Sequence, residues 1–420
     1  MNILITNGRV IGPANKIDEI TDLLIVDGKI AQIGKIGQVE ARVIDATGLL
    51  VTPGLFDMHV HLREPGYEYK ETIESGTRAA SHGGFSSVAC MANTNPVADN
   101  RTVIERILES AKKGTANVFP IVSITKSLAG KELTDFADLI DAGAVAFSDD
   151  GKTVMNINLM RKALELSSEL GIPIIDHCED SRLSKNGVIN DGIISRKLDL
   201  PGIPNSAEST IVQRDIKLAE ETGGHVHIAH VSTAESVKLI RSAKQRGVKI
   251  TAEVTPHHFT LTEEAVEKYG ANAKMNPPLR TQNDVSAVIE GLRDDTIDVI
   301  ATDHAPHTVS EKSQGLLHAP FGIIGLETCV PLVFSKLVKP GHLSISQAIA
   351  KLTCNPARIL KTDRGTLLIG AKADVTLIDA EKVERVDARK FESKSRNTPF
   401  DGWELEGWPV MTIVGGIINR

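Results

Sequence analysis

Apolar and polar residues alternate with two different periodicities along this chain. Between about Leu55 and about Lys361, short β-rich runs alternate with longer stretches in which apolar residues recur every three or four positions, as in residues 100–114 and 158–171. That alternation predicts repeated βα units around a parallel sheet. Eight β-rich runs can be counted, the number that closes a (β/α)8 barrel, and they are residues 55–62, 86–93, 117–125, 144–150, 173–178, 225–231, 249–257 and 298–304.

Both ends of the chain carry the alternating pattern of β-strands instead. Near the N-terminus, apolar runs are separated by Asn7-Gly8 and Asp27-Gly28, which are expected hairpin turns. The tail repeats this pattern in residues 374–382 and 410–419. We therefore predict an α/β protein with a TIM-type (β/α)8 barrel and a small β-sandwich domain built from both termini. The predicted bounds are 55–361 for the catalytic barrel, and 1–54 together with 362–420 for the sandwich.

Charge and composition narrow the class of function. The 420 residues carry a formal net charge of −7 and contain no long run of lysine or arginine. A nucleic-acid or anionic-membrane partner is therefore not expected, and a small-molecule substrate is. No window reaches the ~20 apolar residues that span a bilayer, and the first residues lack a secretion signal, so we expect a cytoplasmic protein. The four cysteines are scattered without a CxxC pair, which predicts reduced thiols.

Residue types that bind metals stand at the carboxyl ends of several expected strands, where the active sites of such barrels lie. A single histidine there is more often a hydrogen-bonded structural residue, and a single aspartate is more often a helix N-cap. A group of them on one rim would be unfavourable unless it binds a cation, so the group predicts a metal site. Its members are His59, His61, Asp149, Asp150, Asp176, His177, His227, His230, Asp303 and His304.

The kinds of ligand indicate which chemistry the metal would perform. His59 and His61 are two residues apart on a strand, so they project to the same face and can hold one ion. Histidine and carboxylate ligands without cysteine favour zinc, or a similar divalent ion, with a position open for water. A central carboxylate can bridge two such ions. The pKa of bound water would fall to about 7, and a further carboxylate must then carry the proton, for which Asp303 is our candidate.

Several segments resemble the signature sequences of class I dihydroorotases, the long bacterial type within the amidohydrolase superfamily. The first segment is HVHLREPG at residues 59–66, and the second is ATDHAPH at residues 301–307, followed by Lys312. MANT at residues 91–94 and MNPPLR at residues 275–280 are also similar to that family. The resemblance therefore extends over the whole chain.

The resemblance implies reversible, zinc-dependent cyclisation of N-carbamoyl-L-aspartate to L-dihydroorotate in de novo pyrimidine (UMP) biosynthesis. It implies one zinc on His59, His61, Asp150 and Asp303, and a second zinc on Asp150, His177 and His230. Asp303 would also be the general base, and Arg63 would bind the ring carboxylate through a planar two-bond contact. The implied substrate contacts are His61, Arg63, Asn93, Asn276, His307, Phe321 and Gly322, the last two through their backbone.

One difference from the wider superfamily concerns the group between the metals. Hydantoinases, allantoinases and several dihydroorotases place a carboxylated lysine there, whereas the end of the fourth strand offers Asp150. Lys152 lies beyond Gly151, where we expect the chain to turn away. The sequence leaves open whether one or two ions bind, and whether His257 and His258 are structural or support the ligands. We also predict that residues 308–318 form a mobile lid over the site.

Two alternative functions are compatible with much of this pattern. Another cyclic amidohydrolase, allantoinase or dihydropyrimidinase, would keep nearly every metal ligand, but Arg63 argues against dihydropyrimidinase because its substrate ring has no carboxylate. A catalytically silent scaffold that binds aspartate transcarbamoylase would be expected to lack ligands, and all are present. The partners we expect are a second copy of the chain in a homodimer and an aspartate transcarbamoylase; the sequence itself leaves both open.

Overall fold

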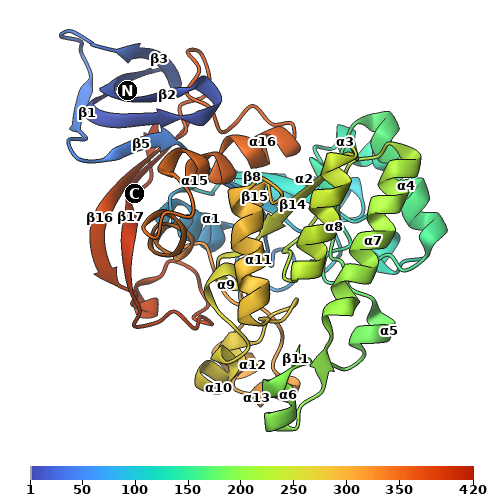
Figure 1. The fold of residues 1–420 in the computed structure, drawn as a ribbon. Helices are drawn as coiled ribbons and strands as arrows, with labels where there is room; N and C mark the ends of the chain where they lie inside the picture. The colour runs from blue at the N-terminus through green and yellow to red at the C-terminus, as the bar shows by residue number, and fades with distance from the viewer. Residues whose placement is uncertain (1) are drawn as a thin grey trace.

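A parallel β-barrel surrounded by helices forms the centre of the molecule (Figure 1). The computed structural model describes residues 2–420. Each barrel strand pairs in parallel with the next one along the chain, and the strands are β6 (Leu55–Val60), β7 (Phe85–Cys90), β8 (Asn117–Val122), β9 (Ala146–Phe147), β10 (Ile174–Asp176), β13 (Val226–Ile228), β14 (Ile250–Val254) and β15 (Val299–Ile300). The predicted eight-stranded barrel is confirmed.

The barrel closes at the level of the predicted metal ligands. Val60, the last residue of β6, pairs in parallel with His304, just beyond β15. The backbone N–H of His61 donates to the carbonyl of His304 at 2.9 Å. First and last strands are thereby joined, so side chains from every strand end can share one rim.

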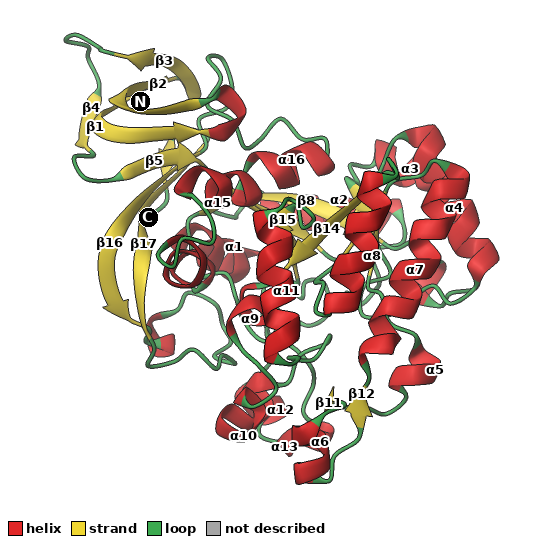
Figure 2. Ribbon diagram, in the orientation of Figure 1, coloured by secondary structure: helices red, strands yellow, loops and turns green. Residues whose placement is uncertain are grey.

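Helices cover the outside of the barrel and leave its carboxyl rim to loops and short elements (Figure 2). The outer helices are α1 (Ile73–His82), α2 (Arg101–Ala111), α3 (Phe136–Asp141), α4 (Ile157–Leu170), α7 (Asn205–Thr222), α8 (Ala234–Gln245), α11 (Gln282–Arg293) and α15 (Ile345–Leu352). The shorter elements are η2 (Lys126–Leu128), α5 (Ser181–Ser184), β11 (Ile189–Asn190), α6 (Ile193–Leu198), β12 (Gly202–Ile203), α9 (Pro256–Thr260), α10 (Ala265–Tyr269), η3 (Gly270–Ala273), α12 (Val309–Lys312), α13 (Gly315–His318), α14 (Cys329–Val333), η4 (Phe334–Val338) and α16 (Cys354–Ile359).

The barrel interior is only partly apolar. Phe56, Met58, Ile121 and Ile175 are fully buried in one cluster, to which Ile359 of α16 also belongs. The alternate residues of β13 and β14, such as Val226 and Ile250, face the outer helices instead. The inward positions of these two strands are therefore left for polar side chains, which become important at the site.

The two chain ends meet in one β-sheet, as predicted. β5 pairs with β1 on one side and with β16 on the other, which joins the N-terminal and C-terminal parts. Side chains from both parts share an apolar core separate from the barrel. The elements are β1 (Ile3–Gly12), η1 (Pro13–Asn15), β2 (Ile17–Val26), β3 (Lys29–Gly34), β4 (Arg42–Asp45), β5 (Leu50–Pro53), β16 (Val375–Arg385), η5 (Ala388–Lys390), β17 (Glu404–Val414) and β18 (Ile417–Ile418). The domain bounds at residues 54/55 and 361/362 stay a prediction.

One predicted turn is wrong. Asp27-Gly28 does join β2 to β3, but Asn7-Gly8 lies inside β1, where the register shifts. Asn7 has φ of 61°, and a Cβ on Gly8 would lie 2.4 Å from Val51 Cγ2. The pair therefore forms a bulge whose glycine allows β5 to approach. The prediction failed because an Asn-Gly pair is favourable in bulges as well as in hairpin turns.

Two further expectations concern membranes and thiols. Over residues 2–420, no helix has the length and apolar character needed to cross a bilayer. Cys90, Cys178, Cys329 and Cys354 are all free thiols, as predicted, and the first three are buried.

Candidate active site

The predicted site residues converge on one cavity at the carboxyl rim of the barrel. The cavity has a volume of about 210 Å³. Its lining residues are His61, Arg63, Asn93, Asp150, Gly151, His177, His230, Asn276, Asp303, Ala305, His307, Phe321 and Gly322. His59 is fully buried next to them, so every predicted ligand and substrate contact lies in or directly beneath this cavity.

Two groups of possible metal ligands share a single carboxylate. His59 Nε2 and His61 Nε2 lie 3.5 and 3.4 Å from the two oxygens of Asp150. His177 Nδ1 and His230 Nε2 lie 3.8 and 3.6 Å from Asp150 Oδ1. Within each group of three, the ligand atoms all lie within 4.8 Å of one another. Asp150 therefore occupies the bridging position between two candidate metal sites.

The donor set fits divalent cations. His59 Nε2 and Asp150 Oδ1 are buried and have no hydrogen-bond partner among residues 2–420. Buried polar atoms are normally paired, so two unpaired atoms facing one another indicate a missing ligand. Imidazole nitrogens and carboxylate oxygens, without a thiolate, are the ligands expected for a catalytic zinc or a similar ion.

Charges within the group support one another. Burial by itself would raise the pKa of Asp150, but His59 and the other imidazoles lower it well below its usual range. Burial also opposes ionisation of Asp303, whose pKa is nevertheless lowered to about 2, chiefly by its hydrogen bond to His61. Asp303 Oδ1 lies 3.0 Å from His61 Nε2 and 3.5 Å from His59 Nε2. Asp303 is therefore an ionised carboxylate between the first group and the open cavity.

A buried glutamate that the sequence analysis did not single out holds His59. Glu253 Oε1 lies 2.5 Å from His59 Nδ1, and Glu253 Oε2 lies 3.2 Å from His227 Nε2. Thr251 Oγ1 lies 2.8 Å from both His227 Nδ1 and His225 Nε2. We call Glu253, His227, Thr251 and His225 the polar column. It runs through the inward positions of β13 and β14, from His59 toward the opposite end of the barrel.

Two further candidate ligands, His61 and His177, are also held through their second nitrogen. His61 Nδ1 lies 2.9 Å from Asn93 Oδ1, so this predicted substrate contact also orients a ligand. His177 Nε2 lies 2.9 Å from Glu179 Oε2, which also accepts from Asn276 Nδ2 at 2.5 Å. Such partners fix the ring and its tautomer. Glu179 was missed, although its position two residues after His177 on the same rim was a usable signal.

Arg63 lines the cavity with a guanidinium that has no carboxylate partner among residues 2–420. Its Nε donates to the carbonyl of Pro306 at 3.2 Å, and its Nη2 lies 3.2 Å from His307 Nε2. Lys70 Nζ lies 3.3 Å from His307 Nδ1, and a lysine can only donate there. His307 therefore carries its proton on Nε2, which donates to the carbonyl of Phe321 at 2.8 Å.

His307 is a neutral residue that holds the loop above the cavity. Burial and the charges of Arg63, Lys70 and Lys312 lower the pKa of His307 to about 2. Both of its ring nitrogens are engaged, so its structural contribution is to position Phe321. Its direct contact with substrate stays a prediction.

Residues from the C-terminal β domain and from α12 hold the same loop. Asn397 Nδ2 donates to the carbonyls of Ala305 and Gly322 at 3.0 and 3.1 Å. Lys312 is buried, and its Nζ donates to the carbonyls of Pro320 and Gly322 at 2.9 Å. The N–H of Gly322 is already bonded to the carbonyl of Lys274. Residues 308–318 are thus anchored through Lys312, and their closure as a lid stays a prediction.

Other strand-end residues face away, partly as expected. Asp149 accepts from the backbone N–H of Thr125, and His304 Nδ1 accepts from the N–H of Gly325, so neither side chain enters the cavity. Lys152 is exposed, which agrees with the expected turn after Gly151. His258 Nδ1 lies 2.8 Å from Thr255 Oγ1, and its Nε2 lies 2.9 Å from the carbonyl of Pro277, the residue after Asn276. His257 is buried with an unpaired Nε2 among the described residues.

Comparisons with known proteins agree with this geometry. A family model described as dihydro-orotase-like matches residues 48–236. A dihydroorotase of Pelotomaculum thermopropionicum is 58% identical over 418 residues, which cover 99% of this chain and 98% of that protein. A dihydroorotase of Geobacter metallireducens is 52% identical over 419 residues, 99% of each chain.

Solved structures share the fold at lower identity. An L-hydantoinase (dihydropyrimidinase) from Arthrobacter aurescens has a TM-score of 0.89 at 25% identity, covering 99% of this chain and 95% of that one. A dihydropyrimidinase from Brevibacillus agri has a TM-score of 0.87 at 23% identity, covering 100% and 95%. The second comparison shows the fold alone.

We expect Glu253→Gln to weaken zinc binding by roughly 10- to 100-fold, because a glutamine cannot accept from both His59 and His227. Competition with a chromophoric chelator measures this affinity. Glu263→Gln is the matched control, since Glu263 is also buried but accepts from Asn190, away from the ligands. Equal zinc affinity in the Glu253→Gln variant and the wild type would contradict the orienting role.

Proposed function

The chain belongs to the dihydroorotase family, and on that premise we propose how its residues catalyse the reversible cyclisation of N-carbamoyl-L-aspartate to L-dihydroorotate in pyrimidine biosynthesis. The observation that carries the proposal is the pair of ligand groups sharing Asp150, placed beneath a cavity that Arg63 lines. The first feature serves amide hydrolysis, and the second selects a substrate that bears a carboxylate.

We propose two zinc ions. His59, His61, Asp150 and Asp303 would hold one, and Asp150, His177 and His230 the other. Zinc bound there would polarise the ring amide carbonyl and lower the pKa of water. The two unpaired buried atoms, His59 Nε2 and Asp150 Oδ1, support occupancy of the first site and of the bridging position.

Asp303 is the proton carrier in this proposal. In ring opening, a water oxygen bonds to the amide carbon, the carbon–nitrogen bond breaks, and Asp303 takes the proton from water and gives it to the departing nitrogen. In cyclisation, Asp303 takes a proton from the attacking carbamoyl nitrogen and returns it to the leaving oxygen. Its ionised state and its place between His61 and the cavity suit the first role.

Arg63 binds the ring carboxylate. Within the described chain its guanidinium pairs with no acid, so N–H groups remain free for a ligand that brings its own negative charge. A planar guanidinium can make two parallel bonds to a carboxylate. Asn93, Asn276 and His61 would contact the ring, while His307 would act mainly by holding the backbone of Phe321 and Gly322.

The alternative cyclic amidohydrolases fit less well. The solved hydantoinases share the fold, but the relatives at 52–58% identity over the full chain are dihydroorotases. None of the residues that line the described cavity is a lysine, so the bridging position falls to Asp150. A silent scaffold would not retain all the ligands. We keep the homodimer, the association with aspartate transcarbamoylase and the cytoplasmic location as parts of the proposal.

A direct assay tests the function. Purified zinc-loaded protein is offered N-carbamoyl-L-aspartate, L-dihydroorotate, allantoin and dihydrouracil. We expect turnover of the first two, with much lower or undetectable turnover of the others. A preference for allantoin or dihydrouracil would overturn the assignment.

We expect Asp303→Asn to leave the fold intact and to lower kcat by more than 10-fold, because the variant loses both a ligand and the proton carrier. Circular dichroism checks the fold, and the assay is run with excess zinc. Asp298→Asn is the control at the other end of the same strand, where the carboxylate pairs with Lys244. A kcat that keeps a tenth or more of the wild-type value counts against the proposed role.

We expect Arg63→Met to lower kcat/KM for L-dihydroorotate by at least ~10-fold, and on the order of 100-fold if the substrate carboxylate is left buried and unpaired. Zinc content should stay unchanged, since Arg63 is not a ligand. Any turnover of dihydrouracil, which has no carboxylate, should change little.

Arg358→Met serves as the matched control, because Arg358 is an exposed arginine on α16, away from the cavity. Its kcat/KM should equal that of the wild type. A loss of less than threefold in Arg63→Met would show that Arg63 does not bind the carboxylate.

A further inference from the structure

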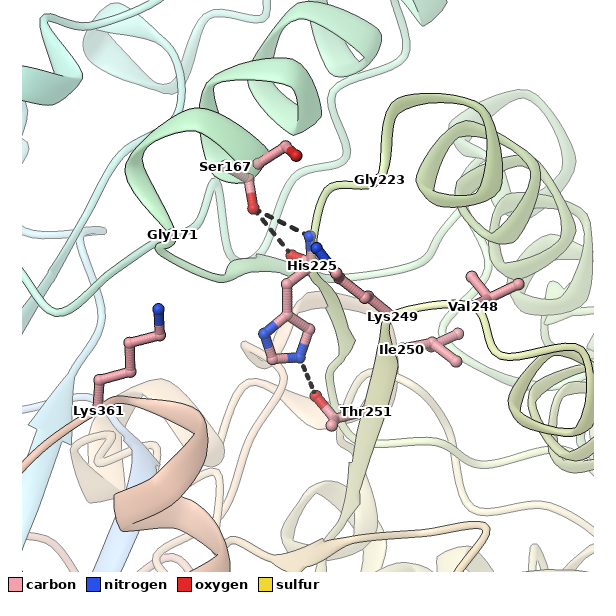
Figure 3. Close-up of a pocket in the computed structure, with 10 residues that line it drawn as sticks. Ser167, Gly171, Gly223, His225, Val248, Lys249, Ile250, Thr251 and Lys361 are labelled. Atoms are coloured by element: carbon pink, nitrogen blue, oxygen red, sulfur yellow. Dashed lines mark hydrogen bonds between the residues drawn. The ribbon is translucent and has the colours of Figure 1, made fainter.

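A second cavity lies at the opposite, N-terminal end of the barrel (Figure 3). Its volume is about 370 Å³, larger than the cavity above the ligands. It lies between the C-terminal ends of α4 and α7, the starts of β13 and β14, and the segment after α16. Its lining residues are Ser167, Ser168, Gly171, Gly223, His225, Val248, Lys249, Ile250, Thr251 and Lys361.

The cavity is positively charged. Lys249 and Lys361 line it, and no aspartate or glutamate does. Both lysines are exposed, and within residues 2–420 neither ammonium makes an ion pair or a hydrogen bond to a neighbour. The ammonium of Lys361 lies against Gly171, where an added Cβ would come within 2.8 Å of it. Figure 3 shows the His225 ring between these two lysine side chains.

The partial negative charges at the C-terminal ends of α4 and α7 do not explain why two lysines line this cavity. The C-terminus of a helix carries about −0.5 of a charge, so α4 and α7 together offset roughly one of the two ammonium charges. A lysine that capped a helix would bond its last carbonyls, and neither Lys249 nor Lys361 does so in the described chain. Burial is the main cause that lowers the pKa of His225 to about 4, and the charges of Lys361, Lys249 and Lys244 contribute, which agrees with a positive potential there.

The polar column determines what His225 presents to the cavity. In its neutral form, His227 donates its Nε2 proton to the Glu253 carboxylate, so its Nδ1 accepts from the hydroxyl of Thr251. The oxygen of Thr251 then accepts from His225 Nε2. Neutral His225 therefore has an unprotonated Nδ1, and Figure 3 shows this nitrogen on the side facing Lys361.

The site thus combines two cationic donors with one neutral acceptor. A carboxylate, with a pKa near 4, would satisfy only the lysines at neutral pH. A phosphate monoester has a second pKa of about 6, so it supplies negative oxygens and can also share a proton with His225 Nδ1. The volume falls within the range of small-molecule pockets and exceeds what a phosphate group alone would fill.

We propose that this cavity binds a small organic phosphate, with the phosphate group on Lys249, Lys361 and His225 and the organic part over Val248. The site is separate from the catalytic cavity and does not depend on the proposed metal chemistry. His225 is also the last member of the polar column, so a ligand on its Nδ1 joins a hydrogen-bonded chain that reaches His59.

Calorimetric titration of the zinc-loaded enzyme tests the site. The probes are inorganic phosphate and ribose 5-phosphate, with ribose as the uncharged comparison. We expect saturable binding of ribose 5-phosphate, weaker binding of inorganic phosphate and none of ribose. In the double variant Lys249→Met/Lys361→Met, the Kd for ribose 5-phosphate should rise at least ~10-fold, because each lost charged contact removes a measurable share of the affinity.

The matched control is Lys113→Met/Lys131→Met, which removes two exposed, unpaired lysines elsewhere on the chain. Its Kd should equal that of the wild type. The substituted lysines are exposed and without partners, so both double variants should fold normally. Absence of saturable binding to the wild type, or an unchanged Kd in the Lys249→Met/Lys361→Met variant, would overturn the proposal; the second result would place the phosphate at another site.

Discussion

The buried carboxylate of Asp150 is the interaction on which the rest of the site depends. Two pairs of imidazoles approach it, each ring nitrogen within 3.8 Å of an oxygen. A carboxylate shielded from water is unfavourable unless positive charge surrounds it, so this arrangement requires cations or protonated rings. The histidines lie in or just after three different strands, and only barrel closure brings those strand ends together. The fold is therefore the means of placing cationic partners around one oxygen pair.

Three of the four candidate histidine ligands have a partner that orients the ring. Glu253 holds His59, Asn93 holds His61, and Glu179 holds His177. Each partner fixes which nitrogen faces Asp150, which is why His59 presents Nε2 while His177 presents Nδ1. Placing Glu253 and His227 inside the barrel replaces apolar packing with charge. Polar residues are tolerated there because each residue of the polar column is hydrogen-bonded to the next one.

Backbone strain occurs at three residues that line the cavity. Arg63, His230 and Asp303 have φ of 63°, 30° and 47°, in the region that side chains rarely adopt. Such conformations cost about 1–3 kcal/mol each and persist where surrounding contacts impose them. All three lie two or three residues after a barrel strand, and all three line the cavity.

What the sequence determined by itself was the barrel and the set of candidate metal ligands. Alternation and strand ends are local properties, so eight strands and the positions of His59, His61, His177, His230 and Asp303 could be predicted from short segments. Local patterns failed where the same residue pair suits two structures. Asn7-Gly8 was expected to form a hairpin turn, and it forms a bulge instead. They also left the orientation of Asp149 and Asp150 ambiguous, because neighbouring aspartates at a strand end look alike until the strand's rotation is known.

Only the tertiary structure decided that Glu253 lies under His59, that Asn397 and Lys312 hold the loop over the cavity, and that a charged cavity lies at the far end of the barrel. These contacts join residues from distant parts of the chain, and no short segment contains the relative placement of two strands.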